Sequence, residues 1–196
     1  MSNRDFLLGQ LLDVSHHPII LGVKGMRFAE EMAAEIIDTL QNQNKLGFFG
    51  AEPFEKATEL LAAEFKSGLT IKREELPVVL INSHCSMGDA YQIPNGTDAS
   101  DPILTKIEEL MDPGDLLIIL TQEATEVIAR IIMRAQEKQI KTLMLCGYPL
   151  PKGINPDQLF CIPLINRSRL EEIYIIFWHL VGVVVESVLF SGGNSF

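Results

Sequence analysis

Short apolar runs alternate with longer amphipathic segments along this chain, and that alternation limits the folds open to it. Each run is too short for a helix and lacks the period of two that marks a strand exposed on one face. Uninterrupted apolar runs of this kind are typical of parallel strands that helices cover on both faces. The expected strands are Leu46–Phe49, Val78–Ile81, Leu116–Leu120, Thr142–Cys146 and Phe160–Pro163.

Helical periodicity fills the intervals between the runs, because apolar residues recur there every three or four positions. The expected helices are Arg4–Val14, Met26–Gln41, Pro53–Lys66, Pro102–Met111, Val127–Lys138 and Ser168–Leu189. This order predicts a three-layer α/β/α sandwich around a five-stranded parallel sheet, doubly wound and flavodoxin-like, with extra N-terminal helices. We expect an N-terminal helical segment (1–24), one α/β domain (25–190) and a flexible tail (191–196).

Charge and composition exclude several classes of function. The 196-residue chain has a net charge of −10 and no cluster of Lys and Arg, so we expect no direct contact with nucleic acid. Its longest uncharged apolar run, Ile173–Val185, is too short to span a bilayer, and no signal peptide is visible. Cys85, Cys146 and Cys161 form no CxxC motif and are expected to be buried free thiols of a cytoplasmic protein.

The last expected helix is apolar almost all round between Ile173 and Val185. Such a helix is buried on every side. In a chain of this size a subunit interface buries it more easily than one subunit does, so we expect a homo-oligomer.

A strand runs into a helix between Asp115 and Ile128, a junction where many α/β proteins hold an anion. The free amide groups and the dipole of a helix N-terminus favour negative charge. A phosphate loop at this place needs Gly, Ser and Thr, but the chain has Gln122, Glu123 and Glu126. We therefore expect the strand–turn–helix backbone of a phosphate site without the side chains that bind phosphate.

The order of elements, together with several local strings, resembles the SIS (sugar isomerase) domain family, in the group that holds phosphoheptose isomerases and the DnaA initiator-associating protein. The matching strings are Gly50, Leu61–Phe65, Leu76–Leu80, Pro113–Ile118, Lys141–Gly147, Ile162-Pro163 and Arg169–Ile173. The resemblance spans roughly residues 25 to 190. It implies an SIS fold and a homodimer or homotetramer. The predicted cleft lies at the carboxyl ends of the strands, where open α/β sheets place ligands.

The family's two phosphate loops are altered in this sequence. Its first loop is a Gly-Asn-Gly-Ser-type turn, of which Gly50 remains, while Phe54 stands where a phosphate-binding Ser is expected. Its second loop is a Ser-Thr-Ser-Gly-Asn-Ser run, which is replaced by the shorter segment Thr121–Thr125. The residues that remain as ligand-binding candidates are Gly50, Glu52, Thr121, Gln122 and Thr125.

The family also carries a metal or acid–base cluster on two helices. Where it has a His and a Glu one turn apart, this chain has Leu60 and Glu64. Where its last helix supplies Asp, Gln and His, this chain has Ser168, Glu171 and His179. The resemblance implies Glu64, Glu171 and His179 as catalytic candidates. Zinc belongs to the family's chemistry, but the ligand set is incomplete here, so no metal or cofactor is expected.

Structural roles compete with each of these assignments. Glu64 fits a helix-surface carboxylate at the rim of a cleft. His179 fits a hydrogen-bonded core or interface residue, paired with Glu64 across subunits if the family's assembly is kept. Ser168 and Glu171 fit a capping box, and Thr121 fits a helix cap.

Two functions follow from this reading. The first is a non-catalytic binding or regulatory protein, with a protein partner such as a replication initiator. The alternative is an isomerase of the sedoheptulose 7-phosphate type, or a phosphosugar-binding protein, with a rebuilt site. A third ligand class, a neutral sugar or a cation near Glu52, Glu123 and Glu126, has less support.

Overall fold

A computed structural model describes residues 22–81, 101–163 and 166–190. These residues form a five-stranded parallel sheet in the order β2-β1-β3-β4-β5. The strands are β1 (Leu46–Gly50), β2 (Val78–Leu80), β3 (Leu116–Leu120), β4 (Lys141–Cys146) and β5 (Gln158–Cys161). The helices are α3 (Val23–Gln41), α4 (Glu55–Ser67), α5 (Asp101–Leu110), α6 (Glu126–Glu137) and α7 (Arg167–Phe190).

The predicted α/β class and all five predicted strands are confirmed, with β5 beginning two residues earlier than expected. Five of the predicted helices are present within two or three residues of their expected bounds. The sixth, Arg4–Val14, lies outside the described residues, as do Cys85 and the tail 191–196.

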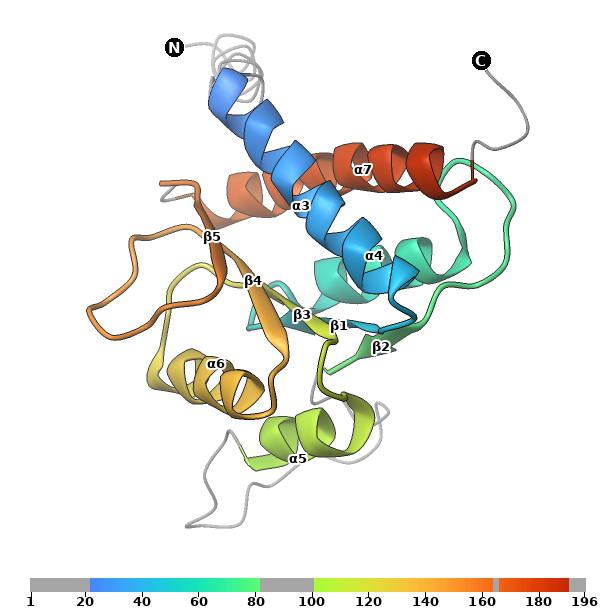
Figure 1. The fold of residues 1–196 in the computed structure, drawn as a ribbon. Helices are drawn as coiled ribbons and strands as arrows, with labels where there is room; N and C mark the ends of the chain where they lie inside the picture. Colours follow the sequence, from blue (N-terminus) through green and yellow to red (C-terminus); the bar gives the residue numbers. More distant parts are fainter. Residues whose placement is uncertain (1–21, 82–100, 164–165, 191–196) are drawn as a thin grey trace, which may run out of the picture.

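Helices cover both faces of the sheet, which makes the three layers visible in Figure 1. Helices α3, α4 and α7 pack on one face around a core that includes Phe48, Phe54 and Trp178. Helices α5 and α6 pack on the other face around a second core that includes Phe49 and Ile119. Neighbours along one strand thus enter opposite cores, which explains why the strand runs are apolar without interruption.

A tight turn sets the start of the central strands. Gly114 has a φ of 93°, a backbone conformation that only glycine adopts without strain. The turn buries Asp115, whose carboxylate accepts hydrogen bonds from the amides of Lys45 at 2.7 Å and Asp112 at 2.8 Å. Because Lys45 precedes β1 and Asp115 precedes β3, this carboxylate fixes the register of the two strands at their amino ends.

Helix α7 is 24 residues long and is the one helix among the described residues with the length and apolar composition of a membrane span. A core helix passes the same criterion, and 44% of its most apolar stretch is buried. It packs on α3 and α4 rather than standing apart from the fold.

Candidate functional site

The first loop of the expected cleft is filled by its own side chains. Phe54 is fully buried, and its carbonyl accepts a hydrogen bond of 2.7 Å from the Thr58 hydroxyl. A Cβ atom on Gly50 would lie 2.2 Å from that hydroxyl oxygen, so the close approach of α4 to β1 requires glycine there. Glu52 is exposed at the turn. Gly50 therefore serves the packing of α4 in this structure.

In the second loop, hydrogen bonds within the fold engage several of the groups that an anion would need. The Thr121 amide donates to the carbonyl of Leu145 at 3.0 Å, and its hydroxyl donates to the carbonyl of Glu123 at 2.7 Å. The Gln122 carbonyl accepts from the amide of Gly147 at 2.8 Å. Thr121 is buried, so its hydroxyl has no exposed position from which to bind a ligand.

The expected helix cap at Thr121 is wrong. The residue before α6 is Thr125, and its hydroxyl oxygen accepts a long hydrogen bond of 3.4 Å from the amide of Ile128. Glu126 then lies in the first turn, where a carboxylate complements the helix dipole. The capping residue is therefore Thr125, three residues before Ile128, and not Thr121 as predicted.

Tyr174 of α7 connects the two loops. Its ring centroid lies 5.2 Å from that of Phe54, and its hydroxyl donates to the Thr121 carbonyl at 2.7 Å. Burial, followed by the thiols of Cys146 and Cys161, raises the pKa of Tyr174 above its ordinary value. Tyr174 is thus a neutral hydrogen-bond donor, and with Phe54 it occupies the space between the loops.

Glu64 and His179 meet as the family pattern predicts, although within one chain and not across subunits. The Glu64 Oε2 atom lies 3.0 Å from the His179 Nε2 atom, and the two side chains are 28% and 40% exposed. The pair joins α4 to α7 at the surface. A carboxylate next to an imidazole is able to orient the ring or exchange a proton with it.

Glu171 does not join this pair. It lies eight residues before His179 on α7, a separation of about 12 Å along the helix axis. The capping box expected from Ser168 and Glu171 is also wrong, because α7 begins one residue earlier at Arg167. The Asn166 side chain accepts a hydrogen bond of 3.3 Å from the amide of Arg169 and so takes the capping position.

No family model matches this chain. A phosphoheptose isomerase of Thermodesulfovibrio yellowstonii is 26% identical over 163 residues, which cover 82% of this chain and 80% of the relative. The structure of a phosphoheptose isomerase from Francisella tularensis superposes with a TM-score of 0.80, at 16% identity, over 95% of this chain and 100% of that one.

The structural likeness establishes the fold, and the sequence relative connects that fold to one group. In sequence and in fold the chain is similar to phosphoheptose isomerases. A more distant solved neighbour is the HobA–DnaA (domain I-II) complex of Helicobacter pylori, with a TM-score of 0.58 at 12% identity and full coverage of both chains.

The described residues do not complete the metal cluster that the resemblance to the SIS-domain family implies. Glu64 and His179 are in contact, but Leu60 offers no donor atom where a His is expected, and Glu171 lies two turns away. Across residues 22–81, 101–163 and 166–190, no three His, Cys, Asp or Glu side chains group as a metal site.

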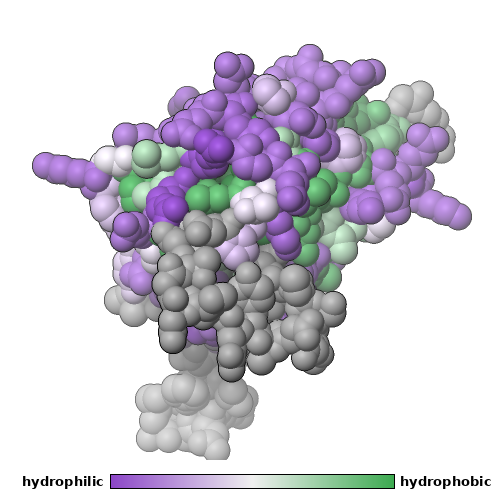
Figure 2. Space-filling model, turned by 90° about the horizontal axis from the view of Figure 1, so that it is seen from below, coloured by the Kyte–Doolittle hydropathy of each residue, from purple (hydrophilic) through white to green (hydrophobic). Residues whose placement is uncertain are grey.

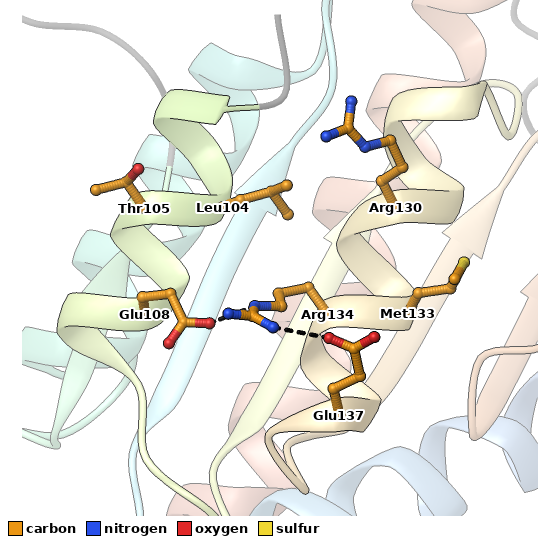
Figure 3. Close-up of a pocket in the computed structure, with 7 residues that line it drawn as sticks. All are labelled: Leu104, Thr105, Glu108, Arg130, Met133, Arg134 and Glu137. Carbon is orange, nitrogen blue, oxygen red and sulfur yellow. Dashed lines mark hydrogen bonds and ion pairs between the residues drawn. The ribbon is translucent and has the colours of Figure 1, made fainter. Parts of the chain in front are cut away.

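Two grooves among the described residues lie away from the two altered phosphate loops. A groove of about 590 Å³ runs between α5 and α6, and one of about 210 Å³ lies at the amino ends of β3 and β4. Figure 2 views the molecule from the side of α5 and α6, and the described surface that is visible there is largely hydrophilic with apolar patches. In Figure 3, Arg134 of α6 reaches across the larger groove to Glu108 of α5 and also bonds Glu137. Neither groove is lined by the expected ligand-binding residues.

Sequence reasoning missed the residues that close the site. Phe54 stands out in the sequence as a misfit in a phosphate loop, but its contact with Tyr174 depends on the position of α7. The apolar position of Tyr174 in the helical repeat (one turn after Leu170) carried the signal that it faces the sheet. Its hydroxyl, which a buried tyrosine must satisfy, predicted a polar partner without naming the Thr121 carbonyl.

Proposed function

We propose that this protein is a non-catalytic SIS-domain protein that acts by binding. The observation that carries the proposal is the side-chain filling between the loops, where Phe54 and Tyr174 pack against each other. A phosphate needs amides and hydroxyls that face a polar cavity. The buried ring of Phe54 and the engaged groups of Thr121 offer neither.

We expect no stabilisation of the protein by sugar phosphates. A ligand at one hundred times its dissociation constant raises the free energy of unfolding by about 2.7 kcal/mol, which a thermal shift assay detects. Melting temperatures with sedoheptulose 7-phosphate and other sugar phosphates are therefore expected to equal that of the free protein. Inorganic sulfate at the same ionic strength is the control. A rise with one sugar phosphate alone would contradict the proposal.

The partner that we propose is a protein, and a replication initiator is the first to test. Support comes from the neighbour that is solved as a complex of HobA with DnaA. A net charge of −10 disfavours direct DNA binding, which leaves the initiator protein itself as the contact. Isothermal titration with the initiator from the same genome tests this partner. We include a cytoplasmic location in the proposal, since Cys146 and Cys161 are free thiols.

The contact of Glu64 with His179 favours one alternative, a sugar-phosphate isomerase with a rebuilt site. Such an enzyme needs a group that moves a proton between adjacent carbons, and an imidazole paired with a carboxylate is suited to that task. Turnover of sedoheptulose 7-phosphate that is lost in both Glu64→Gln and His179→Ala would support the alternative. Absence of turnover in the wild-type protein would remove it.

We also propose that the protein is a homo-oligomer assembled through α7. The helix buries one side on the sheet and leaves a large apolar stripe on the other. The exposed apolar side chains of this stripe are Ile176, Leu180, Val183, Val184 and Val188, between 38% and 57% exposed, and Leu60 of α4 is 47% exposed. Contiguous apolar surface of this kind marks interaction sites. The expected burial of α7 on all sides thus requires a second subunit.

Charges placed in this stripe are expected to dissociate the oligomer. Leu180→Glu and Val184→Glu each bring a carboxylate into an apolar contact, which costs several kcal/mol when it is left unpaired. Light scattering coupled to gel filtration is expected to give a dimer or tetramer for the wild type and a monomer for each variant. Met133→Glu, at an exposed methionine on α6, is the matched control and should keep the wild-type mass. A monomeric wild type would contradict the proposal.

A further inference from the structure

Two cysteines that are fifteen positions apart in sequence lie side by side in the sheet. Cys146 ends β4 and Cys161 ends β5, and the two are register partners across the parallel ladder. Neighbouring strands are about 4.8 Å apart, which is within the range of about 4.4–6.8 Å between Cα atoms that a disulfide spans. Both side chains lie on the α5–α6 side of the sheet, because both pack with the second core.

The two thiols differ in exposure. Cys146 is fully buried, whereas Cys161 is partly exposed at the edge of the sheet. The Cys146 Sγ donates to the Tyr148 carbonyl at 3.0 Å. Burial, and next to it the neighbouring Cys161 thiol, raise the pKa of Cys146, so the more exposed Cys161 is the thiol that reacts first. The arrangement pairs an accessible attacking thiol with a protected resolving thiol.

We propose that Cys146 and Cys161 form a dithiol site that is reversibly oxidised to a disulfide by small-molecule disulfides such as oxidised glutathione. The Cys161 thiolate attacks one sulfur of the oxidant, the sulfur–sulfur bond of the oxidant breaks, and one glutathione leaves. Cys146 then attacks the Cys161 sulfur and displaces the second glutathione. The protein loses two electrons, and its two thiol protons leave with the two glutathione molecules.

Oxidation at this site reaches the candidate site through the loop after β4. The disulfide removes the hydrogen bond from Cys146 to the Tyr148 carbonyl. Gly147, which lies between Cys146 and Tyr148, donates a hydrogen bond from its amide to the Gln122 carbonyl. Cross-linking β4 to β5 thus changes the support of the second loop at residues 121–125. A disulfide that forms in a reducing compartment is typically regulatory or catalytic.

Tryptic mapping tests the proposal directly. Full-length Cys85→Ser protein, which retains only this pair of thiols, is incubated with oxidised glutathione, alkylated under denaturing conditions and digested. Cleavage after Lys141, Lys152 and Arg167 places the two cysteines in peptides 142–152 and 153–167. We expect these peptides to appear joined, and dithiothreitol to separate them. The wild type, mapped in parallel, is expected to show the same joined pair.

Single variants separate the two chemical steps. In Cys146→Ser the reaction is expected to stop with one glutathione on Cys161, and in Cys161→Ser the buried Cys146 is expected to stay alkylatable. Two free thiols in the Cys85→Ser protein after oxidation would overturn the proposal. So would a stable glutathione adduct on Cys161 in a protein that retains Cys146. The mapping does not depend on any partner or ligand, so it stands apart from the proposed function.

Discussion

Phe54→Ala is expected to lower the free energy of unfolding by about 3–5 kcal/mol, which is the usual cost of truncating a fully buried Phe. Phe54 has no exposed surface and stacks obliquely on Tyr174 between the two loops. Its removal takes away the apolar area and leaves a cavity that the neighbouring backbone of α4 cannot close, because Thr58 already contacts Gly50. The effect is therefore expected at the upper end for a single substitution.

Urea denaturation followed by circular dichroism measures this loss. Met133→Ala is the matched control, because it shortens an apolar side chain that is 59% exposed on α6, and its effect is expected to stay within about 0.5 kcal/mol. Phe54→Leu, which retains most of the volume, is expected to lose less than the alanine variant. A loss below about 1 kcal/mol for Phe54→Ala would mean that the ring does not fill the space between the loops.

The second large effect is expected at Glu186, near the end of α7. Its carboxylate accepts hydrogen bonds from the amides of Leu69 at 2.7 Å and Thr70 at 2.9 Å, and from the Thr70 hydroxyl at 2.6 Å. Arg73 lies 3.1 Å away, and both charged side chains are less than 5% exposed. Glu186→Ala leaves the Arg73 guanidinium buried without its carboxylate partner, so the free energy of unfolding is expected to fall by about 3–5 kcal/mol.

The contribution of Glu186 depends on pH with a definite sign. Burial alone raises the pKa of this carboxyl, but the Thr70 hydroxyl, the two amides and the Arg73 charge outweigh burial, and the pKa lies below the ordinary 4.5. A depressed pKa gives stability that is fully present above that ordinary value and is lost as the pH falls through the folded-state pKa. The stability difference between wild type and Glu186→Gln is therefore expected to hold at neutral pH and to shrink below about pH 4.5.

Chemical denaturation at several pH values measures that difference. Glu172→Ala is the matched control on the same helix, because Glu172 pairs with Arg169 at the surface, where an ion pair contributes less than about 1 kcal/mol. A Glu186 variant as stable as this control would show that the loop after α4 is held by its other contacts.

The order of strands and helices could be predicted from the spacing of apolar residues, because each element has its own local pattern of apolar and polar residues. Uninterrupted apolar runs predicted strands that face two cores, and Phe48 and Phe49 of β1 do face opposite cores. Helix ends were predicted less well. Both caps depended on which polar residue the backbone places in an extended conformation, and Thr125 and Asn166 took the positions expected for Thr121 and Ser168.

The contacts of the candidate site could be identified only once the fold was known. The Glu64–His179 contact followed from the family pattern, although its location within one chain depends on how α4 and α7 pack. The contact between the two cysteines could not be predicted from the sequence. Fourteen residues separate Cys146 from Cys161, and only the register of β4 and β5 brings them together. The Arg73–Glu186 pair is of the same kind, with partners on elements far apart in the chain.

The placement of Phe54 in the core has a consequence for the evolution of this chain. A serine at this position would restore the residue type of the family's phosphate loop, but it would also remove a ring worth about 3–5 kcal/mol from a domain whose total stability is about 5–15 kcal/mol. Tyr174 would have to change as well before a ligand gained room. No single accessible substitution leads back to a phosphate loop, so descent from this sequence is expected to retain the closed arrangement.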